Sequence, residues 1–400
     1  MAKLNYLTTI AIDTDRSVIH FYSMTGNDRD TIVHQVKSYR GAHFGAEFFE
    51  RFKQAVKEYT LETPSDSIRK ITVVLPDSAV LLDAIKVPTM KGTNQTRKTL
   101  SVTLGNLYKN YSDLRMLAYV ADQNKQYSTY AITAVQRRIV SSIYAACAEN
   151  KLFVDTLTFA SCATISGALS LHSKIKNDSY LFLDVKEHSS KFIFVAGGKT
   201  TGFYSLPFGL DLLNSEKVIQ EDMLFNHSYA ELFVLNARER AKSKKLTIME
   251  ADEMDETTVD VDEDDEDFEM DETPTEIVEL QPQGKVYTKK TPRKLPKFML
   301  RDIPETIEGV KCENFRTFIK WALSLIRDNE KLVALGEPEF VCVNIPKDLE
   351  FVIDKANEEI EENGIRFTRL STDEENPEIT LNLELFGGLS TKYVNQYGKF

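Results

Sequence analysis

The sequence predicts an α/β protein of two related lobes, and three observations support this class. A length of 400 residues exceeds what one ordinary core holds and favours two globular lobes. An order of three strands, a helix and a strand near the N-terminus begins again close to residue 180. A helix-and-hairpin unit separates the two copies. We therefore expect a duplicated fold with two lobes and a cleft, and a small α+β subdomain inserted in the first lobe.

The first copy is predicted from the apolar alternation of its strands. These strands are expected at residues 6–14, 17–24, 31–39 and 71–75, and the last of them ends before Pro76. Six apolar residues between Phe44 and Tyr59 recur at helical spacing, which predicts a helix between the third and fourth strands.

The inserted unit is predicted between the two copies. A helix is expected at 100–108, a hairpin at 114–121 and 127–135, a second helix at 136–149 and a closing strand at 153–159. The second helix is supported by one apolar stripe, which consists of Ile139, Val140, Ile143, Tyr144 and Cys147.

The second copy shows the same order of elements. Its strands are expected at 180–185, 191–196, 201–206, 340–344 and 365–370, with Gly197-Gly198 in the turn between the second and third. Its helices are expected at 229–244, 313–327 and 348–363, and Gly364 fits the stop of the last one. The predicted boundaries are 1–90 and 153–178 for the first subdomain, 91–152 for the inserted subdomain, 179–215 and 313–400 for the second subdomain, and 216–312 for a further helical and strand subdomain.

One acidic segment accounts for the net charge of −12. Residues 250–272 contain 15 acidic residues among 23 and no basic one, and the rest of the chain is nearly neutral. Such a segment buries too little apolar surface to offset its ordering entropy, so a disordered loop is expected at 250–284. A basic stretch follows between Lys285 and Lys297. The two stretches are either a solvated acid-base linker or a docking tail.

The four cysteines and the ends of the chain exclude several classes of protein. Cys147, Cys162, Cys312 and Cys342 form no CxxC pair and sit in apolar runs, so reduced and buried thiols are expected and a structural zinc site is not. We find no run of 18 apolar residues and no signal peptide, which predicts a cytoplasmic protein without direct membrane insertion.

Several short segments together resemble one family of proteins. The main ones are Ala-Ile-Asp-Thr-Asp-Arg-Ser at 11–17, Leu-Asp-Val-Lys-Glu-His-Ser-Ser at 183–190 and Phe-Gly-Gly-Leu at 386–389, and the others are 75–76, 84–88 and 203–213. In order and spacing they resemble the type IV pilus PilM and FtsA-like group of actin-like proteins, over nearly the whole chain. The resemblance implies a duplicated ribonuclease H-like actin fold in which a hairpin turn of each lobe faces the phosphates of ATP, with Mg²⁺.

The resemblance also implies which residues would hold the nucleotide. Asp13 and Asp184 would contact Mg²⁺ and phosphate from the ends of corresponding strands. The rest of the implied cofactor site is Thr14, Asp15, Arg16, Lys186, Ser189 and Ser190. The alternative is that Asp13 and Asp184 are turn-forming carboxylates without a ligand.

Three departures from the family pattern bear on the cofactor. Asp15 and Lys186 occupy places where the family has glycine, and Asn344-Ile345-Pro346 replaces paired glycines in the adenine turn. Because side chains and proline hinder a close approach of the backbone to phosphate, these departures argue against tight ATP binding. The cofactor is therefore either ATP with Mg²⁺ or none. Arg16 and Lys186 then either bind phosphate or pair with Asp15 or Glu187 and close the cleft.

The resemblance implies a scaffold on the cytoplasmic face of a type IV pilus-like or related envelope assembly machine. It would bind the cytoplasmic tail of an inner-membrane partner and stay peripheral to the membrane through that partner. Five tyrosines of the inserted unit either anchor this interface or are ordinary strand residues, namely Tyr108, Tyr111, Tyr119, Tyr127 and Tyr130. Self-association is left open. Nucleic acid is not expected as a partner, because the acidic segment would compete with phosphates.

Other functions remain as alternatives. An active actin-like ATPase is favoured by the retained Asp13 and Asp184 and opposed by the missing glycines. A cell-division protein of the FtsA type would end in a basic amphipathic helix, which residues 390–400 do not form. For a sugar kinase, no base that would activate a substrate can be singled out.

Overall fold

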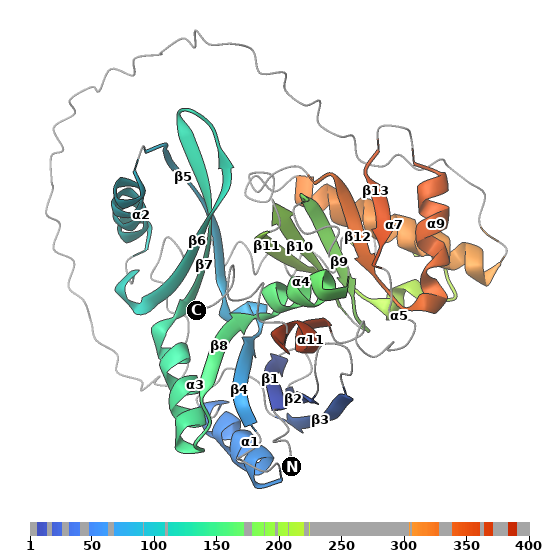
Figure 1. Cartoon of the computed structure of the whole chain (residues 1–400). Helices are drawn as coiled ribbons and strands as arrows, with labels where there is room; N and C mark the ends of the chain where they lie inside the picture. The colour runs from blue at the N-terminus through green and yellow to red at the C-terminus, as the bar shows by residue number, and fades with distance from the viewer. Residues whose placement is uncertain are drawn as a thin grey trace, which may run out of the picture.

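The computed structural model places two lobes side by side, with a small third sheet next to them (Figure 1). The described residues are 6–13, 18–25, 32–40, 48–62, 68–90, 92–108, 111–171, 178–187, 189–196, 199–206, 208–219, 224, 304, 306–327, 338–360, 364–370 and 383–389. The acidic segment at 250–284 and the helix expected at 229–244 lie outside these residues.

The first lobe is built on a five-stranded sheet in the order β3-β2-β1-β4-β8. Its strands are β1 (Tyr6–Asp13), β2 (Val18–Thr25), β3 (Ile32–Arg40), β4 (Ile68–Leu75) and β8 (Val154–Phe159). β1, β2 and β3 are antiparallel, whereas β4 runs parallel to β1 and β8 runs parallel to β4. Valine, isoleucine and threonine dominate β1 and the second half of β4, as is usual for strands covered on both faces.

The second lobe repeats this topology in the order β11-β10-β9-β12-β13. Its strands are β9 (Tyr180–Val185), β10 (Ser190–Ala196), β11 (Lys199–Leu206), β12 (Phe340–Asn344) and β13 (Arg366–Arg369). β9, β10 and β11 are antiparallel, and β12 and β13 run parallel to β9. The same strand order with the same directions in both lobes confirms the predicted duplicated fold.

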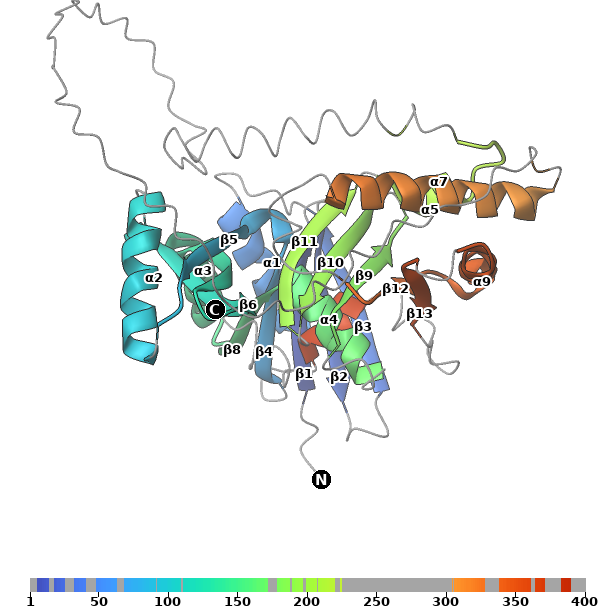
Figure 2. The ribbon, with the colours of Figure 1, turned by 90° about the horizontal axis from the view of Figure 1, so that it is seen from above.

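Helices cover the outer face of each sheet. In the first lobe, α1 (Phe48–Glu62) packs beside α3 (Arg137–Glu149), and Phe52 and Ile143 enter a common core with Ile10. In the second lobe, α7 (Ile307–Arg327) and α9 (Phe351–Glu358) pack together over the second sheet. Figure 2 shows α7 running along the second lobe. Each helix places its apolar stripe on its sheet, which leaves the two inner faces of the sheets turned toward one another.

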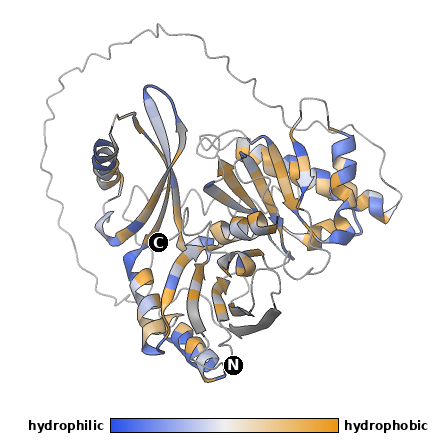
Figure 3. Ribbon diagram, in the orientation of Figure 1, coloured by the Kyte–Doolittle hydropathy of each residue, from blue (hydrophilic) through white to orange (hydrophobic). Residues whose placement is uncertain are grey.

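A helix that the sequence analysis did not predict fills the space between the two sheets. In α4 (Ala160–Leu171) ten of the twelve residues are buried. Ile165 lies in one continuous core with Leu157 of the first sheet and Phe182 of the second. Figure 3 shows that α4 and the strands of the second sheet are mostly apolar. The two lobes are therefore joined by a shared apolar core around α4.

A second short helix, α11 (Leu383–Leu389), packs against α4 and against β1 and β4. The contact is so close that a Cβ on Gly387 would lie 1.7 Å from the Ala163 carbonyl oxygen. A Cβ on Gly167 would likewise lie 2.4 Å from the Leu383 carbonyl oxygen. The Phe-Gly-Gly-Leu motif thus ends this described helix and packs it against the first lobe. The helix begins at Leu383, three residues before the motif.

The inserted unit is a three-stranded sheet, β5-β7-β6, covered on one face by α2 (Thr93–Leu107). Its strands are β5 (Leu81–Pro88), β6 (Leu114–Gln123) and β7 (Tyr127–Gln136). The structure differs here from the predicted boundaries at residues 90 and 152 in two ways. β5 pairs with β7 and so belongs to the small sheet. α3 packs with α1 in the core of the first lobe, because its apolar stripe faces that core.

The remaining elements are close to the expected ones. Two short 3₁₀ helices, η2 (Asp77–Ala79) and η5 (Lys347–Leu349), follow Pro76 and Pro346 at matching places in the two lobes. The helix expected at 348–363 is therefore η5 followed by α9, and α7 begins before the expected residue 313. The remaining short elements are η3 (Tyr111–Asp113) and α5 (Leu210–Leu213). All four cysteines are buried and free. Among the helices that the structure describes, none is both long and apolar enough to cross a membrane.

Candidate functional site between the two lobes

Asp13 and Asp184 both lie on the inner faces of their sheets. Asp13 is the last residue of β1, and strand alternation puts it on the same face as Ala11, which packs against α4 and α11. Asp184 is the penultimate residue of β9 and shares its face with Phe182, which belongs to the core around α4. Sequence reasoning treated the two as corresponding strand ends. Asp13 ends its strand and Asp184 lies one residue before the end of its strand, but both face the boundary between the lobes.

Lys186 reaches from the second lobe to a carboxylate on α11. Its Nζ lies 3.4 Å from Glu384 Oε2, and α11 is packed on the first sheet. Burial lowers the pKa of Lys186, but the negative charges of Glu384, Asp184 and Asp13 outweigh it and leave the pKa raised above 10.5. Both predicted metal carboxylates therefore act on this lysine, which carries a positive charge at the boundary.

Lys191, on β10, forms a second ion pair across the same boundary. Its Nζ lies 2.5 Å from Asp77 Oδ2, and the two side chains are 17% and 5% exposed. Ser161, at the start of α4, donates its backbone N–H to Asp77 Oδ1 at 2.9 Å and its hydroxyl to Oδ2 at 2.8 Å. Asp77 therefore binds the N-terminus of α4 and the second lobe at once.

The six charged residues at this boundary form one electrostatic group. We call them the interlobe cluster, which consists of Asp13, Asp77, Asp184, Glu384, Lys186 and Lys191. Burial raises the pKa of Glu384, although Lys186 and Lys191 both lower it. Glu384 in turn raises the pKa of both lysines. Burial opposes the charged form of all three groups, but the carboxylates outweigh it at the two lysines, whereas the lysines do not outweigh it at Glu384.

The turn between β9 and β10 is committed to contacts within the second lobe. The Lys186 backbone N–H donates to the Ser189 carbonyl oxygen at 2.8 Å, and Ser190 Oγ donates to the Phe208 carbonyl oxygen at 2.6 Å. A Cβ on Gly209 would lie 2.1 Å from the Lys186 carbonyl oxygen, so this turn rests directly on the start of α5. The backbone N–H of Lys186 and the hydroxyl of Ser190, two residues that the sequence analysis assigned to the phosphate site, therefore already have hydrogen-bond partners.

Asp184 has a partner from the neighbouring strand. Asn344, at the end of β12, donates Nδ2–H to Asp184 Oδ1 at 2.8 Å, and both residues are buried. Asn344 begins the Asn-Ile-Pro segment that replaces the paired glycines of the family pattern. Asn344 thus forms a hydrogen bond with Asp184, the carboxylate that the sequence analysis assigned to Mg²⁺.

Several predicted site residues remain to be placed. Thr14, Asp15 and Arg16 lie outside the described residues. Lys186 pairs with Glu384 instead of Glu187, whose side chain is exposed. Sequence reasoning missed Asp77, Lys191 and Glu384. Lys191 carried a signal, because it is a lysine inside the otherwise apolar strand Ser-Lys-Phe-Ile-Phe-Val-Ala.

A magnesium nucleotide does not fit the described part of this boundary as it is arranged. Both lysines already pair with carboxylates, and the backbone of the second turn is bonded internally. In the ranges that the structure describes, no three His, Cys, Asp or Glu side chains are grouped to hold a metal ion, but Mg²⁺ bound with a nucleotide needs only one or two protein carboxylates. The charged groups at this boundary between the lobes are paired with one another.

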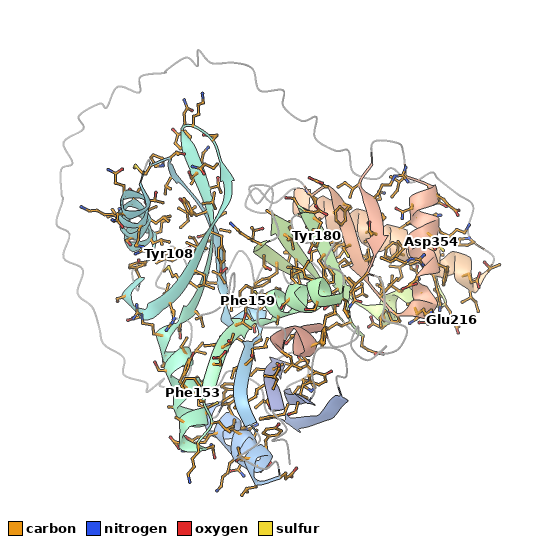
Figure 4. All side chains as sticks on the ribbon, in the orientation of Figure 1. Tyr108, Phe153, Phe159, Tyr180, Glu216 and Asp354 are labelled. Carbon is orange, nitrogen blue, oxygen red and sulfur yellow. The ribbon has the colours of Figure 1, made fainter. Side chains whose placement is uncertain are left out.

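The tyrosines of the inserted unit divide into two groups. Tyr108, which Figure 4 labels beside α2, is buried and donates its hydroxyl to Asp83 Oδ2. Tyr130 packs against the same small core, and Tyr111 donates to Ser101 Oγ at 3.3 Å. Tyr127 is 43% exposed, with the Lys86 ammonium 4.6 Å from its ring centre. Tyr108, Tyr111 and Tyr130 therefore serve the small core, Tyr119 is half-buried, and the exposed Tyr127 remains available for an interface.

Two duplicated sheets with a buried helix between them define the actin-like fold. Among solved structures, the chain is similar to a chain of the PilM-PilN type IV pilus biogenesis complex. The identity is 14%, the TM-score is 0.51, and the match covers 98% of each chain. This similarity confirms the actin-like fold that the resemblance implied.

Other similarities are weaker. Ethanolamine utilization protein EutJ from Carboxydothermus hydrogenoformans is 11% identical with a TM-score of 0.37, over 95% of this chain and 89% of that one. The cytoplasmic domain of EpsL, an inner membrane component of the type II secretion system of Vibrio cholerae, is 10% identical with a TM-score of 0.34. That match covers 51% of this chain and 71% of the EpsL chain. No protein-family model matches the sequence, and no curated protein matches it significantly.

Proposed function

We propose that this chain is an actin-like scaffold of a type IV pilus-like or related envelope assembly machine, and that it works without hydrolysing nucleotide. The observation that carries the proposal is the interlobe cluster. Lysines and turn groups at the place where this fold would bind phosphates are paired with first-lobe carboxylates and with their own lobe. The likeness in fold to a chain of the PilM-PilN complex supports the kind of machine.

The proposed partner is the cytoplasmic tail of an inner-membrane protein, which keeps the scaffold at the inner face of the membrane. The inserted unit is the proposed docking region. Residues 81–136 contain seven lysines and arginines, three aspartates and no glutamate. Lys86 and Tyr127 lie together on this sheet, and both are exposed. A unit with a net positive charge and an exposed aromatic ring suits a tail that carries acidic and apolar residues.

Peptide binding tests this proposal directly. Labelled synthetic tails of the single-pass inner-membrane proteins from the same machine are titrated with the full chain, and fluorescence anisotropy is followed. We expect one tail to bind and Tyr127→Ala to weaken it at least about tenfold, as for an interface anchor. Leu61→Ala, at a still more exposed apolar residue on α1, is the control and leaves the affinity unchanged. If no tail binds the wild type, the scaffold proposal is wrong.

An active actin-like ATPase is the second candidate. The observation in its favour is that Asp13 and Asp184 both face the boundary and both act on Lys186. This candidate requires ATP turnover by the wild type that is lost in Asp13→Ala. A turnover unaffected by that substitution would point to a contaminating enzyme instead.

A further inference from the structure

The ion pair between Lys191 and Asp77 joins parts of the chain that belong to different lobes. Lys191 is on the second strand of the second sheet, and Asp77 follows the fourth strand of the first sheet. Both side chains are nearly buried, so water screens their attraction much less than it screens a surface pair. The pair is therefore suited to resist a separation of the lobes.

Asp77 is held in place by contacts other than the one with Lys191. Both of its carboxylate oxygens accept hydrogen bonds from Ser161, which starts the helix between the sheets. An anchored carboxylate loses little side-chain entropy when the lysine binds. The ion pair therefore connects three elements: η2, the N-terminus of α4 and β10.

The surroundings keep Lys191 charged. Burial alone would lower its pKa, but Asp77, Glu384 and Asp184 together raise it. In an actin-like fold a bound ligand can supply contacts to both lobes. In this chain the carboxylates of the first lobe and the lysines of the second provide contacts of that kind from within.

Apolar contacts between the lobes also oppose their separation. Phe159, at the end of β8, lies 6.4 Å from Phe203 of β11, measured between ring centres. Figure 4 labels Phe159 beside α4, at the meeting of the two sheets. The small sheet also touches β11, and Ala84 and Ala131 pack with the second-lobe core. Separating the lobes would expose all of this apolar surface to water.

We propose that the Lys191–Asp77 ion pair takes the place of a bound ligand and holds the two lobes closed in the absence of nucleotide. The inference deepens the proposed function, since a scaffold needs one fixed shape and an ATPase cycle needs two. Lys186–Glu384 is the weaker contact of the cluster, because its atoms are 3.4 Å apart and Glu384 bears a burial cost.

Distance measurements between spin labels test this proposal on the full chain. Labels at Lys57→Cys on α1 and Asp354→Cys on α9 report on the two lobes, since both residues are exposed and the native cysteines are buried. We expect one narrow distance distribution for the wild type, unchanged by millimolar MgATP. Lys191→Met should broaden it and shift it to longer distances, whereas Glu384→Gln should leave it narrow. Asp77→Asn, which can still accept a hydrogen bond from Ser161, should act like Lys191→Met.

The outcomes separate this inference from the proposed function. A wild type that is open alone and closes with MgATP would overturn the inference, as would a Lys191→Met chain with an unchanged distribution. If Lys191→Met fails to fold, hydrogen exchange of the wild type decides. The amides of α4 should be equally protected with and without MgATP, and nucleotide-dependent protection would contradict the inference. Tail binding is measured separately, so its loss with intact closure would refute the scaffold alone.

Discussion

Lys191 and Asp77 lie 2.5 Å apart, Nζ to Oδ2, although they are 114 positions apart in the chain and belong to different lobes. Because the pair is nearly buried, its energetics differ from those of a surface ion pair. Removing one partner leaves the other charge without full compensation, whereas removing both restores balance. This difference allows the pair to be tested by a double-mutant cycle.

Lys191→Met should lower the free energy of unfolding by about 3 kcal/mol, since it leaves a buried carboxylate without its cation. The double variant Lys191→Met with Asp77→Asn should lose less than the two single variants together. Urea denaturation measures all four proteins. The control Lys53→Met breaks the ion pair between Lys53 and Glu149, whose side chains are 40% and 53% exposed, and should change stability far less than Lys191→Met. Strict additivity in the cycle would refute the coupling.

Glu384→Gln should not destabilise the protein at neutral pH and should stabilise it slightly. The pKa of Glu384 is raised above 4.5, mainly by burial and also by Asp77 and Asp13, against the opposing effect of Lys186 and Lys191. A carboxyl group with a raised pKa binds its proton more tightly in the folded chain, so its ionisation costs stability above that pKa. The advantage of the variant should therefore shrink as the pH falls through the raised pKa of Glu384. A variant that is less stable than the wild type at neutral pH would contradict this reasoning.

Asn314→Leu should destabilise the second lobe by about 2 kcal/mol, because it leaves buried polar groups unpaired. Asn314 is buried on α7, accepts a hydrogen bond from the Ile219 N–H at 2.8 Å and donates to the Lys217 carbonyl oxygen at 3.1 Å. The segment after α5 is thereby joined to α7. Thermal unfolding measures the loss. Asn357→Ala does not serve as a control, because the Asn357 side chain also donates a hydrogen bond to a backbone carbonyl oxygen. An unchanged melting temperature would show that the segment is held by other contacts.

Gly387→Ala and Gly105→Ala should change stability in opposite directions. A Cβ at Gly387 would collide with the Ala163 carbonyl oxygen, so α11 has to move away from α4, at a cost of more than about 2 kcal/mol. No atom lies within 4 Å of a Cβ added at Gly105 inside α2, so alanine should gain roughly 0.5–1 kcal/mol from helix propensity. Denaturant titration compares the two. A loss of stability at Gly105 would indicate that the glycine is needed for some other reason.

The regular part of the fold could be predicted from the sequence because its pattern is local. Nine of the ten strands in the two large sheets were expected within about two residues of their ends, since each alternates or is bounded by turn residues. The tenth, β4, begins three residues earlier than expected, where Arg69 and Lys70 interrupt the apolar run. The helix α3 was expected from its single apolar stripe.

The parts that were missed depend on tertiary packing. α4 has apolar or small residues on every side, because it is enclosed by two sheets, and a helix buried all round shows no stripe. β5 belongs to the small sheet only through its pairing with β7. Asp77 pairs with Lys191 and Glu384 pairs with Lys186, and each pair joins residues more than a hundred positions apart. Sequence spacing therefore could not predict either pair.

Isothermal calorimetry of MgATP binding tests the central claim most directly. The wild type and Asp13→Ala are each titrated with nucleotide to millimolar concentration. Because the lysines and turn groups at the boundary are already paired, we predict no saturable heat from either protein. Saturable binding by the wild type that is lost in Asp13→Ala would contradict the account. It would show that nucleotide displaces the interlobe ion pairs and that the chain is an actin-like nucleotide-binding protein.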